Sequence, residues 1–142
     1  MLDTIIVGHR RGVERGVLDA VEDRNFLYDG YYLKSKYNEE EYLPEKYHLK
    51  ELDSDSYSYR NQMLYEKADG ILILITSKFD FDYEKNFNGL KEKEKTTIIL
   101  KDNPEQNKQN KDQINNWIKK NNKVKKLLIV GPHEEEMYEI TL

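Results

Sequence analysis

The stretch TIIVGHRRGVERGVLDAV, residues 4–21, decides the fold class of this chain. Its first four residues, Thr4 to Val7, form an apolar and β-branched run that enters a loop with glycine at both ends. Apolar residues then recur at helical spacing. A continuous apolar run is typical of a strand buried on both faces of a parallel sheet. The stretch therefore predicts a strand, a tight turn and a helix, which together open an α/β domain.

Three later runs have the same continuous apolar character, and they are residues 70–75, 97–100 and 127–130. Apolar residues at helical spacing lie within residues 13–21, 59–68 and 114–118, and they predict crossover helices. Alternating strands and helices predict a Rossmann-like three-layer α/β domain with a mainly parallel sheet. Because the length suits one core and no linker is visible, we expect residues 1–142 to form a single domain.

The segment from residue 26 to residue 58 is rich in tyrosine and only modestly hydrophobic. It is too long for an ordinary connection between a strand and a helix. We therefore expect it to contain short strands of its own and to contribute to function.

Composition limits the partners of the chain. The formal net charge is −4, and Lys and Arg are spread along the whole length, without the dense basic face of a general nucleic-acid binder. There is no cysteine, which excludes thiolate metal sites and suits a reducing compartment. No apolar run approaches the length that crosses a bilayer. We expect a cytoplasmic protein with no membrane partner and no nucleic-acid partner.

The glycine loop, residues 8–12 with the sequence GHRRG, carries the most informative chemistry. Between a strand and a helix, backbone N–H groups of the helix N-terminus point outward and bind anions. Glycine at both ends permits close approach of a ligand, and we expect a positive φ at Gly8. Arg10 and Arg11 can add charged donors for phosphate or carboxylate oxygens. The alternative is a tight turn with two solvated arginines.

The order of motifs along the chain resembles the molybdenum-cofactor carrier-like family of the SLOG superfamily, a Rossmann-like group related to DprA and Lonely-guy proteins. IIVGHRRGVERGVLDAV is similar to the family's opening, a hydrophobic strand followed by GGQTGVDRAALDAA. The matching positions are Gly8, Gly12, Val13, Arg15, Leu18 and Asp19. The likeness continues through Gly30, Lys34, Glu39, LPEKYHLKE, Tyr59-Arg60, ADGILIL and LLIVGPHEEEMYE, and so covers nearly the whole chain.

The chain also departs from the family pattern. His9, Arg10 and Arg11 replace a glycine, a glutamine and a threonine, which makes the loop bulkier and more basic. Where the family has a second phosphate loop of the form GGTALT, this chain has FDFDYEK at residues 79–85. In Lonely-guy relatives that loop belongs to the machinery that hydrolyses nucleoside phosphates, and Glu84 is the nearby acid here. The lost loop therefore favours binding without catalysis.

Two candidate residues take their roles from the resemblance. Lys34 matches a family lysine, which implies neutralisation of a second phosphate, and its alternative is a solvated surface lysine. Arg60 opens a helix at a family arginine, and its alternative is an ion pair with Asp55 or Glu39.

The last apolar run ends in Gly131-Pro132-His133. Because open α/β sheets bind ligands at the carboxyl ends of their strands, we expect Gly131, His133 and His9 to line one crevice. Two histidines without a third ligand at recognisable spacing do not make a metal site. We expect neither a metal nor a cofactor.

Two functions compete at this point. The first is non-catalytic binding of a phosphate-bearing nucleotide or nucleotide-derived molecule, which the protein would sense, carry or sequester. By family analogy the ligand would be an ADP-ribose-type immune signal, sequestered by a phage or mobile-element protein that forms a homo-oligomer. The alternative is a Lonely-guy-like N-glycosidase, or phosphoribohydrolase, that uses a glutamate. A third is an interaction domain with a dead pocket.

Overall fold

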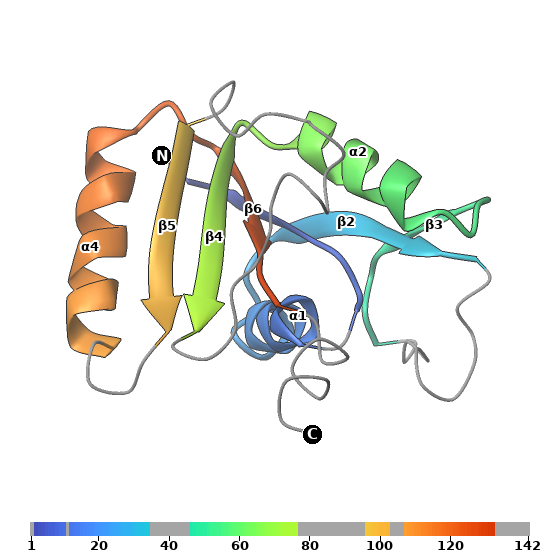
Figure 1. Ribbon diagram of the computed structural model, residues 1–142, viewed down its shortest axis with the longest axis horizontal. Coiled ribbons are helices and arrows are strands. Elements are labelled where there is room, and N and C mark those ends of the chain that lie inside the picture. The colour runs from blue at the N-terminus through green and yellow to red at the C-terminus, as the bar shows by residue number, and fades with distance from the viewer. Residues whose placement is uncertain (1, 11, 35–45, 77–95, 103–106, 133–142) are drawn as a thin grey trace.

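The computed structural model describes residues 2–10, 12–34, 46–76, 96–102 and 107–132. A six-stranded parallel sheet has the strand order β3-β2-β1-β6-β4-β5 (Figure 1). Its strands are β1 (Thr4–Val7), β2 (Tyr28–Leu33), β3 (Lys50–Leu52), β4 (Gly70–Thr76), β5 (Thr96–Asp102) and β6 (Lys126–Val130). The described helices are α1 (Val13–Asp23), α2 (Tyr57–Lys67) and α4 (Asn107–Lys120). The predicted Rossmann-like α/β class with a parallel sheet is confirmed.

The four continuous apolar runs are strands β1, β4, β5 and β6, as predicted. Successive residues of a strand point to opposite faces of the sheet, and here both faces are covered. On one face Ile5 and Val7 share a core cluster with Leu18 of α1, against which Trp117 of α4 packs. On the other face Ile6 packs with Leu64 of α2. Helices on both faces explain why these strands contain continuous apolar runs.

The last strand, β6, lies between β1 and β4 in the middle of the sheet. Its Leu127 is paired with Ile5 of β1, and its Leu128 with Ile71 of β4. Parallel neighbours end at the same edge of a sheet. The loops that follow β1 and β6 therefore leave the sheet beside each other.

The predicted short strands within residues 26–58 are β2 and β3, which continue the sheet on the other side of β1. After β3, the hydroxyl oxygen of Ser56 caps α2 by accepting a hydrogen bond from the Tyr59 N–H at 3.2 Å. This cap fixes where α2 begins, and so it places Tyr57 and Arg60 in the first turn of that helix.

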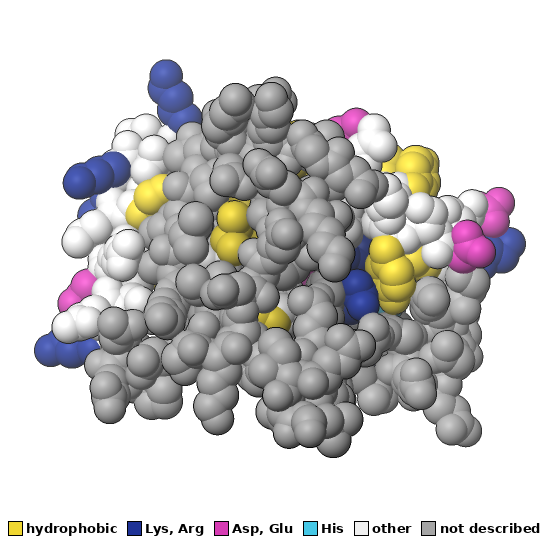
Figure 2. Space-filling model, in the orientation of Figure 1, with side chains coloured by type: hydrophobic (Ala, Val, Ile, Leu, Met, Phe, Trp, Pro, Cys, Tyr) yellow, Lys and Arg dark blue, Asp and Glu magenta, His cyan; other side chains and the backbone are white. Residues whose placement is uncertain are grey.

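None of the helices in the described ranges is long and apolar enough to span a bilayer. On the face drawn in Figure 2, the Lys and Arg side chains of the described residues are scattered and form no dense patch.

Candidate functional site

The glycine loop and the loop after β6 are joined by a hydrogen bond. The N–H of Val13, the first residue of α1, donates to the carbonyl of Pro132 at 3.1 Å. Gly131 lies in close contact with α1 and β4, because a Cβ there would approach Val13 Cγ2 to 2.7 Å and the Leu74 carbonyl oxygen to 2.8 Å. The structure therefore brings Gly8, Gly12 and Gly131 to one edge of the sheet. We call the surroundings of these two loops the candidate site.

The two glycines of the glycine loop meet different demands. Gly12, the N-cap of α1, has a φ of 114°, which side chains disfavour. Gly8 does not have the positive φ that we expected from the sequence, so that prediction is wrong. Gly8 is required for lack of space instead, because a Cβ would lie 2.3 Å from Glu14 Oε1 and 2.5 Å from Arg60 Nη1.

Arg60 and Glu14 form a buried ion pair beside the glycine loop. The two guanidinium nitrogens Nη1 and Nη2 donate to Glu14 Oε1 and Oε2 at 2.7 and 2.8 Å, and both side chains are almost fully buried. Arg60 Nε and Nη2 also donate to Asn61 Oδ1, at 3.2 and 2.7 Å. Arg60 thus has an ion-pair partner, which is Glu14 and not Asp55, while Glu39 lies outside the described residues.

Glu14 was missed as a functional candidate in the sequence. Besides Arg60, its Oε1 accepts a hydrogen bond at 3.0 Å from the N–H of Arg10 in the glycine loop. An acidic residue in the first turn of a helix often turns back to N–H groups at that end, and this signal was present in the sequence. The Glu14 carboxylate therefore occupies part of the loop where we expected a ligand anion.

His9 is fully buried at 0% exposure. Its ring stacks on Tyr57, with centroids 6.0 Å apart and planes 17° apart, and it meets Tyr32 edge-on at 6.2 Å. Neither ring nitrogen has a hydrogen-bond partner among the described residues. Burial, followed by the positive charge of Arg60, lowers the pKa of His9 to about 3. The imidazole is therefore neutral near pH 7.

Arg10 and Arg15 lie on the same side of the fold as His9. The guanidinium carbon of Arg10 is 4.4 Å from the centroid of the Tyr57 ring, at cation–π distance. Arg15 donates from Nε and Nη2 to the carbonyl of His9, at 3.2 and 2.9 Å. Arg15 was not predicted as a site residue, and it holds the backbone of the glycine loop.

Of the remaining predicted residues, Lys34 is the one that the structure describes. Lys34 follows β2, and its ammonium forms an exposed 3.3 Å ion pair with Asp53, which agrees with the solvated alternative. Arg11, His133 and Glu84 lie outside the described residues. Within the described ranges no three His, Cys, Asp or Glu side chains gather as they would around a metal ion.

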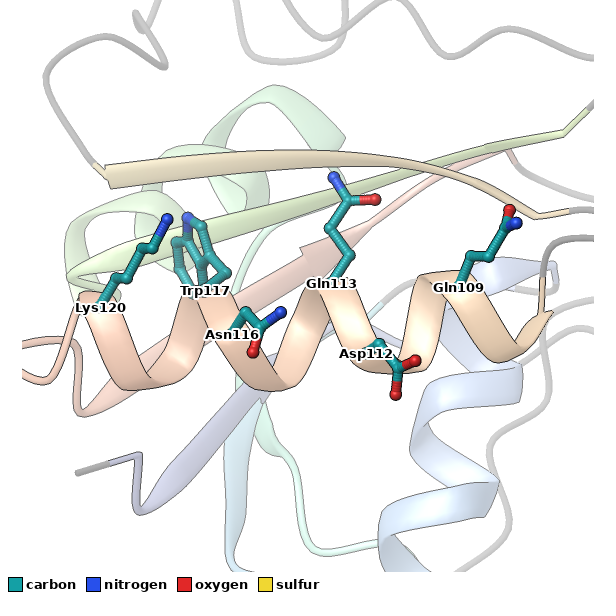
Figure 3. Close-up of a pocket in the computed structure, with 6 residues that line it drawn as sticks. All are labelled: Gln109, Asp112, Gln113, Asn116, Trp117 and Lys120. Atoms are coloured by element: carbon teal, nitrogen blue, oxygen red, sulfur yellow. The ribbon is translucent and has the colours of Figure 1, made fainter.

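A concave region with a volume of about 520 Å³ lies along α4 (Figure 3). Its lining side chains all project from that one helix, and they are Gln109, Asp112, Gln113, Asn116, Trp117 and Lys120. None of them was predicted as a site residue, and they comprise three uncharged amides, one carboxylate, one ammonium and one aromatic ring. The arrangement offers no cluster of groups for chemistry.

Comparison with known proteins agrees with this architecture. The family model described as "Circularly permutated YpsA SLOG family" matches residues 5–141. A crystal structure of a "putative molybdenum carrier protein" from Syntrophus aciditrophicus SB is similar, with a TM-score of 0.75 and 23% sequence identity. The alignment covers 99% of this chain and 90% of that chain, and at this identity it shows a shared fold. No curated protein matches the sequence significantly.

Proposed function

The chain belongs to the circularly permuted YpsA SLOG family, and from this premise we propose that it binds a phosphate-bearing nucleotide or nucleotide-derived small molecule without converting it. The family assignment confirms the SLOG resemblance of the sequence. The proposed binding place is the candidate site, where the strands β1 and β6 end side by side. Ligands of open parallel sheets bind at that edge.

One observation supports the proposal most. A fully buried, neutral histidine lies among arginines at the carboxyl end of a central strand, with two tyrosine rings around it. Arginine forms charge-assisted hydrogen bonds with phosphate oxygens, and the neutral imidazole offers one donor and one acceptor to an uncharged polar group. These groups together suit a molecule that is charged at one end and polar but uncharged at the other.

The phosphate contacts that we propose come from side chains more than from the helix N-terminus. At the start of α1, the N–H groups of Val13, Arg15 and Gly16 donate to the carbonyls of Pro132, Arg10 and Gly12. The N–H of Arg10 donates to Glu14. We therefore propose Arg10 and Arg11 as the main phosphate partners, with lesser contributions from Lys34 and His133 and with Arg60 acting only as the support of Glu14.

The same geometry favours binding over N-glycosidase catalysis. A glycosidase of this kind needs a carboxylate held beside the reacting ribose carbon. In the described part of the glycine loop and α1, the Glu14 carboxylate accepts hydrogen bonds from Nη1 and Nη2 of Arg60 and from the N–H of Arg10. Its negative charge is therefore neutralised, and it is poorly placed to take part in bond cleavage.

Family analogy extends the proposal to the biological role. SLOG domains serve as nucleotide-signal sensors in prokaryotic immune systems, so we propose an ADP-ribose-type signal as the ligand. A stand-alone domain of phage or mobile-element origin would then sequester that signal in the host cytoplasm.

The proposal is tested by identifying what the purified protein carries. Small molecules released by denaturation would be analysed by mass spectrometry, beside a thermal-shift panel of nucleotides and ADP-ribose compounds. A ligand at a hundredfold excess over its Kd should stabilise the fold by about 2.7 kcal/mol. If no phosphorylated compound is released or shifts the melting temperature, the chain is an interaction domain with a dead pocket.

The same samples separate binding from catalysis. We expect nucleoside monophosphates and ADP-ribose to be recovered intact after incubation with stoichiometric protein. Release of free base by the wild type, abolished in Glu84→Gln, would establish the glycosidase instead.

The loop's part in binding is tested with the double variant Arg10→Ala/Arg11→Ala. Each charge-assisted hydrogen bond lost should weaken ligand binding by about 1.5–3 kcal/mol, with an unchanged urea midpoint. Equal affinity of wild type and double variant would remove the glycine loop from the site.

A further inference from the structure

His9 has a feature that packing alone does not explain. Its imidazole is fully buried between Tyr57 and Tyr32, and neither ring nitrogen has a hydrogen-bond partner among the described residues. Buried polar groups in proteins are almost always hydrogen-bonded, and an exception calls for an explanation. A phenylalanine would fill a space between two tyrosine rings without burying two polar atoms. The unpaired imidazole nitrogens therefore indicate that His9 has a hydrogen-bond partner other than the described protein groups.

The surroundings of His9 decide what kind of partner suits it. Burial most strongly lowers the pKa of His9, and the positive charges of Arg60, Arg15 and Arg10 lower it further, against the opposing effect of the Glu14 carboxylate. The neutral imidazole has one N–H donor and one acceptor nitrogen. Arginine has donors only. His9 therefore supplies what the three arginines lack, namely an acceptor for an O–H or N–H group.

We infer that His9 is a specificity-determining residue whose acceptor nitrogen binds an O–H or N–H group of a nucleoside, while Arg10 binds the phosphate. This inference rests on the proposed function and deepens it, because it assigns the uncharged half of the ligand to a named side chain. A ribose hydroxyl and an exocyclic amino group of a base both offer the required hydrogen. Bare phosphate or pyrophosphate at neutral pH offers it poorly, since those oxygens are mainly acceptors.

The test compares the binding of four probes by isothermal titration calorimetry: pyrophosphate, ribose 5-phosphate, AMP and ADP-ribose. The variant His9→Phe keeps a ring between Tyr57 and Tyr32 and removes both nitrogens. His48→Phe is the matched control, because His48 is exposed. We expect His9→Phe to lose about tenfold in affinity for the nucleoside or ribose probes, with unchanged affinity for pyrophosphate and no effect of His48→Phe.

The probes also identify the group that His9 binds. A loss that is already present with ribose 5-phosphate assigns the contact to a ribose hydroxyl. A loss confined to AMP and ADP-ribose assigns it to the base.

The outcomes separate this inference from the proposed function. If the wild type binds none of the four probes, the proposed function fails for these ligand classes. If the wild type binds and His9→Phe binds every probe equally well, the proposed function stands and the role of His9 is wrong. An equal loss for all probes, pyrophosphate included, would also overturn the inference, because His9 would then act on the phosphate or on the shape of the loop.

A measurement on the wild type keeps the test valid if His9→Phe fails to fold. The ¹⁵N chemical shifts of the histidine rings would be recorded with and without saturating AMP. We expect the acceptor nitrogen of His9 to shift on binding and those of His48 to stay in place. Unmoved His9 nitrogens in an AMP complex that shifts the backbone signals of the glycine loop would overturn the inference.

Discussion

Helix α2 carries two ion pairs, one near each end, and they differ in burial. Arg60, in its first turn, pairs with Glu14 with side-chain exposures of 1% and 3%, whereas Lys67, its last residue, pairs with Asp29 of β2 at 20% and 28%. Both have short distances, 2.7 and 2.9 Å. Distance alone therefore does not distinguish them.

The difference lies in what each charge would meet if its partner were lost. Asp29 lies within 3.6 Å of a second lysine, Lys50, accepts from the Gly30 N–H, and is partly open to water. The Arg60 side chain is buried against the glycine loop, beside His9 and Glu14. Removing one member of a buried pair leaves an uncompensated charge, while water compensates at the surface. The buried pair therefore shapes the candidate site, and the other pair fastens the far end of the helix.

The largest effect is expected from Glu14→Gln. The variant keeps the size of the side chain but leaves the Arg60 charge buried and unneutralised, which should lower the free energy of unfolding by about 3–5 kcal/mol. Urea denaturation measures this loss. The double variant Glu14→Gln/Arg60→Met removes both charges and should recover a large part of it. A urea midpoint of Glu14→Gln equal to that of the wild type would mean that the ion pair does not contribute to stability by this amount.

Gly8→Ala should have the next largest effect. The added Cβ would fall within 2.5 Å of both Glu14 Oε1 and Arg60 Nη1, and overpacking of this kind costs about 1–3 kcal/mol. Gly16→Ala is the matched control, because a Cβ there meets nothing within 4 Å, and alanine in a helix interior should stabilise by about 0.5–1 kcal/mol. Equal urea midpoints for the two variants would show that Glu14 and Arg60 can shift to accommodate a side chain at Gly8 without loss of stability.

The third prediction concerns pH and His9. The unfolded chain binds a proton at His9 near pH 6.5, whereas the folded protein does so only near pH 3. The contribution of His9 to stability is therefore fully present above pH 6.5 and falls by about 1.4 kcal/mol per pH unit as the pH drops toward 3. His9→Phe should lack this component. Parallel stability-against-pH curves for wild type and His9→Phe would contradict the lowered pKa of His9.

Asp29→Asn should have the smallest effect. The half-buried pair with Lys67 is screened by solvent, so its loss should cost about 1 kcal/mol or less. The same urea titration measures it, and 1 M salt should reduce the difference from wild type further. A loss as large as that of Glu14→Gln would abolish the contrast between the two ends of α2.

Arg60 and His9 show how much of the candidate site could be predicted from the sequence. Arg60 was selected because it matches a family arginine, yet its partner Glu14 is 46 residues away in the chain, and no local pattern identifies such a pair. His9 stands in a basic loop of small and charged residues, which suggested exposure to a ligand and gave no sign of complete burial between Tyr57 and Tyr32.

The sequence by itself determined the strands β1, β4, β5 and β6 and the helices between them, because strands buried on both faces contain continuous apolar runs and helices covering them are apolar on one side. It also indicated the glycine loop after β1, because glycines at both ends of a short segment between a strand and a helix are typical of a tight turn. The tertiary structure alone decided that β6 enters the sheet between β1 and β4, which joins Pro132 to Val13. It also decided that Gly8 is needed for space and not for its φ, and that Glu14 partly fills the loop. These features depend on contacts between distant segments, and such contacts form only once the sheet and both helical layers have assembled.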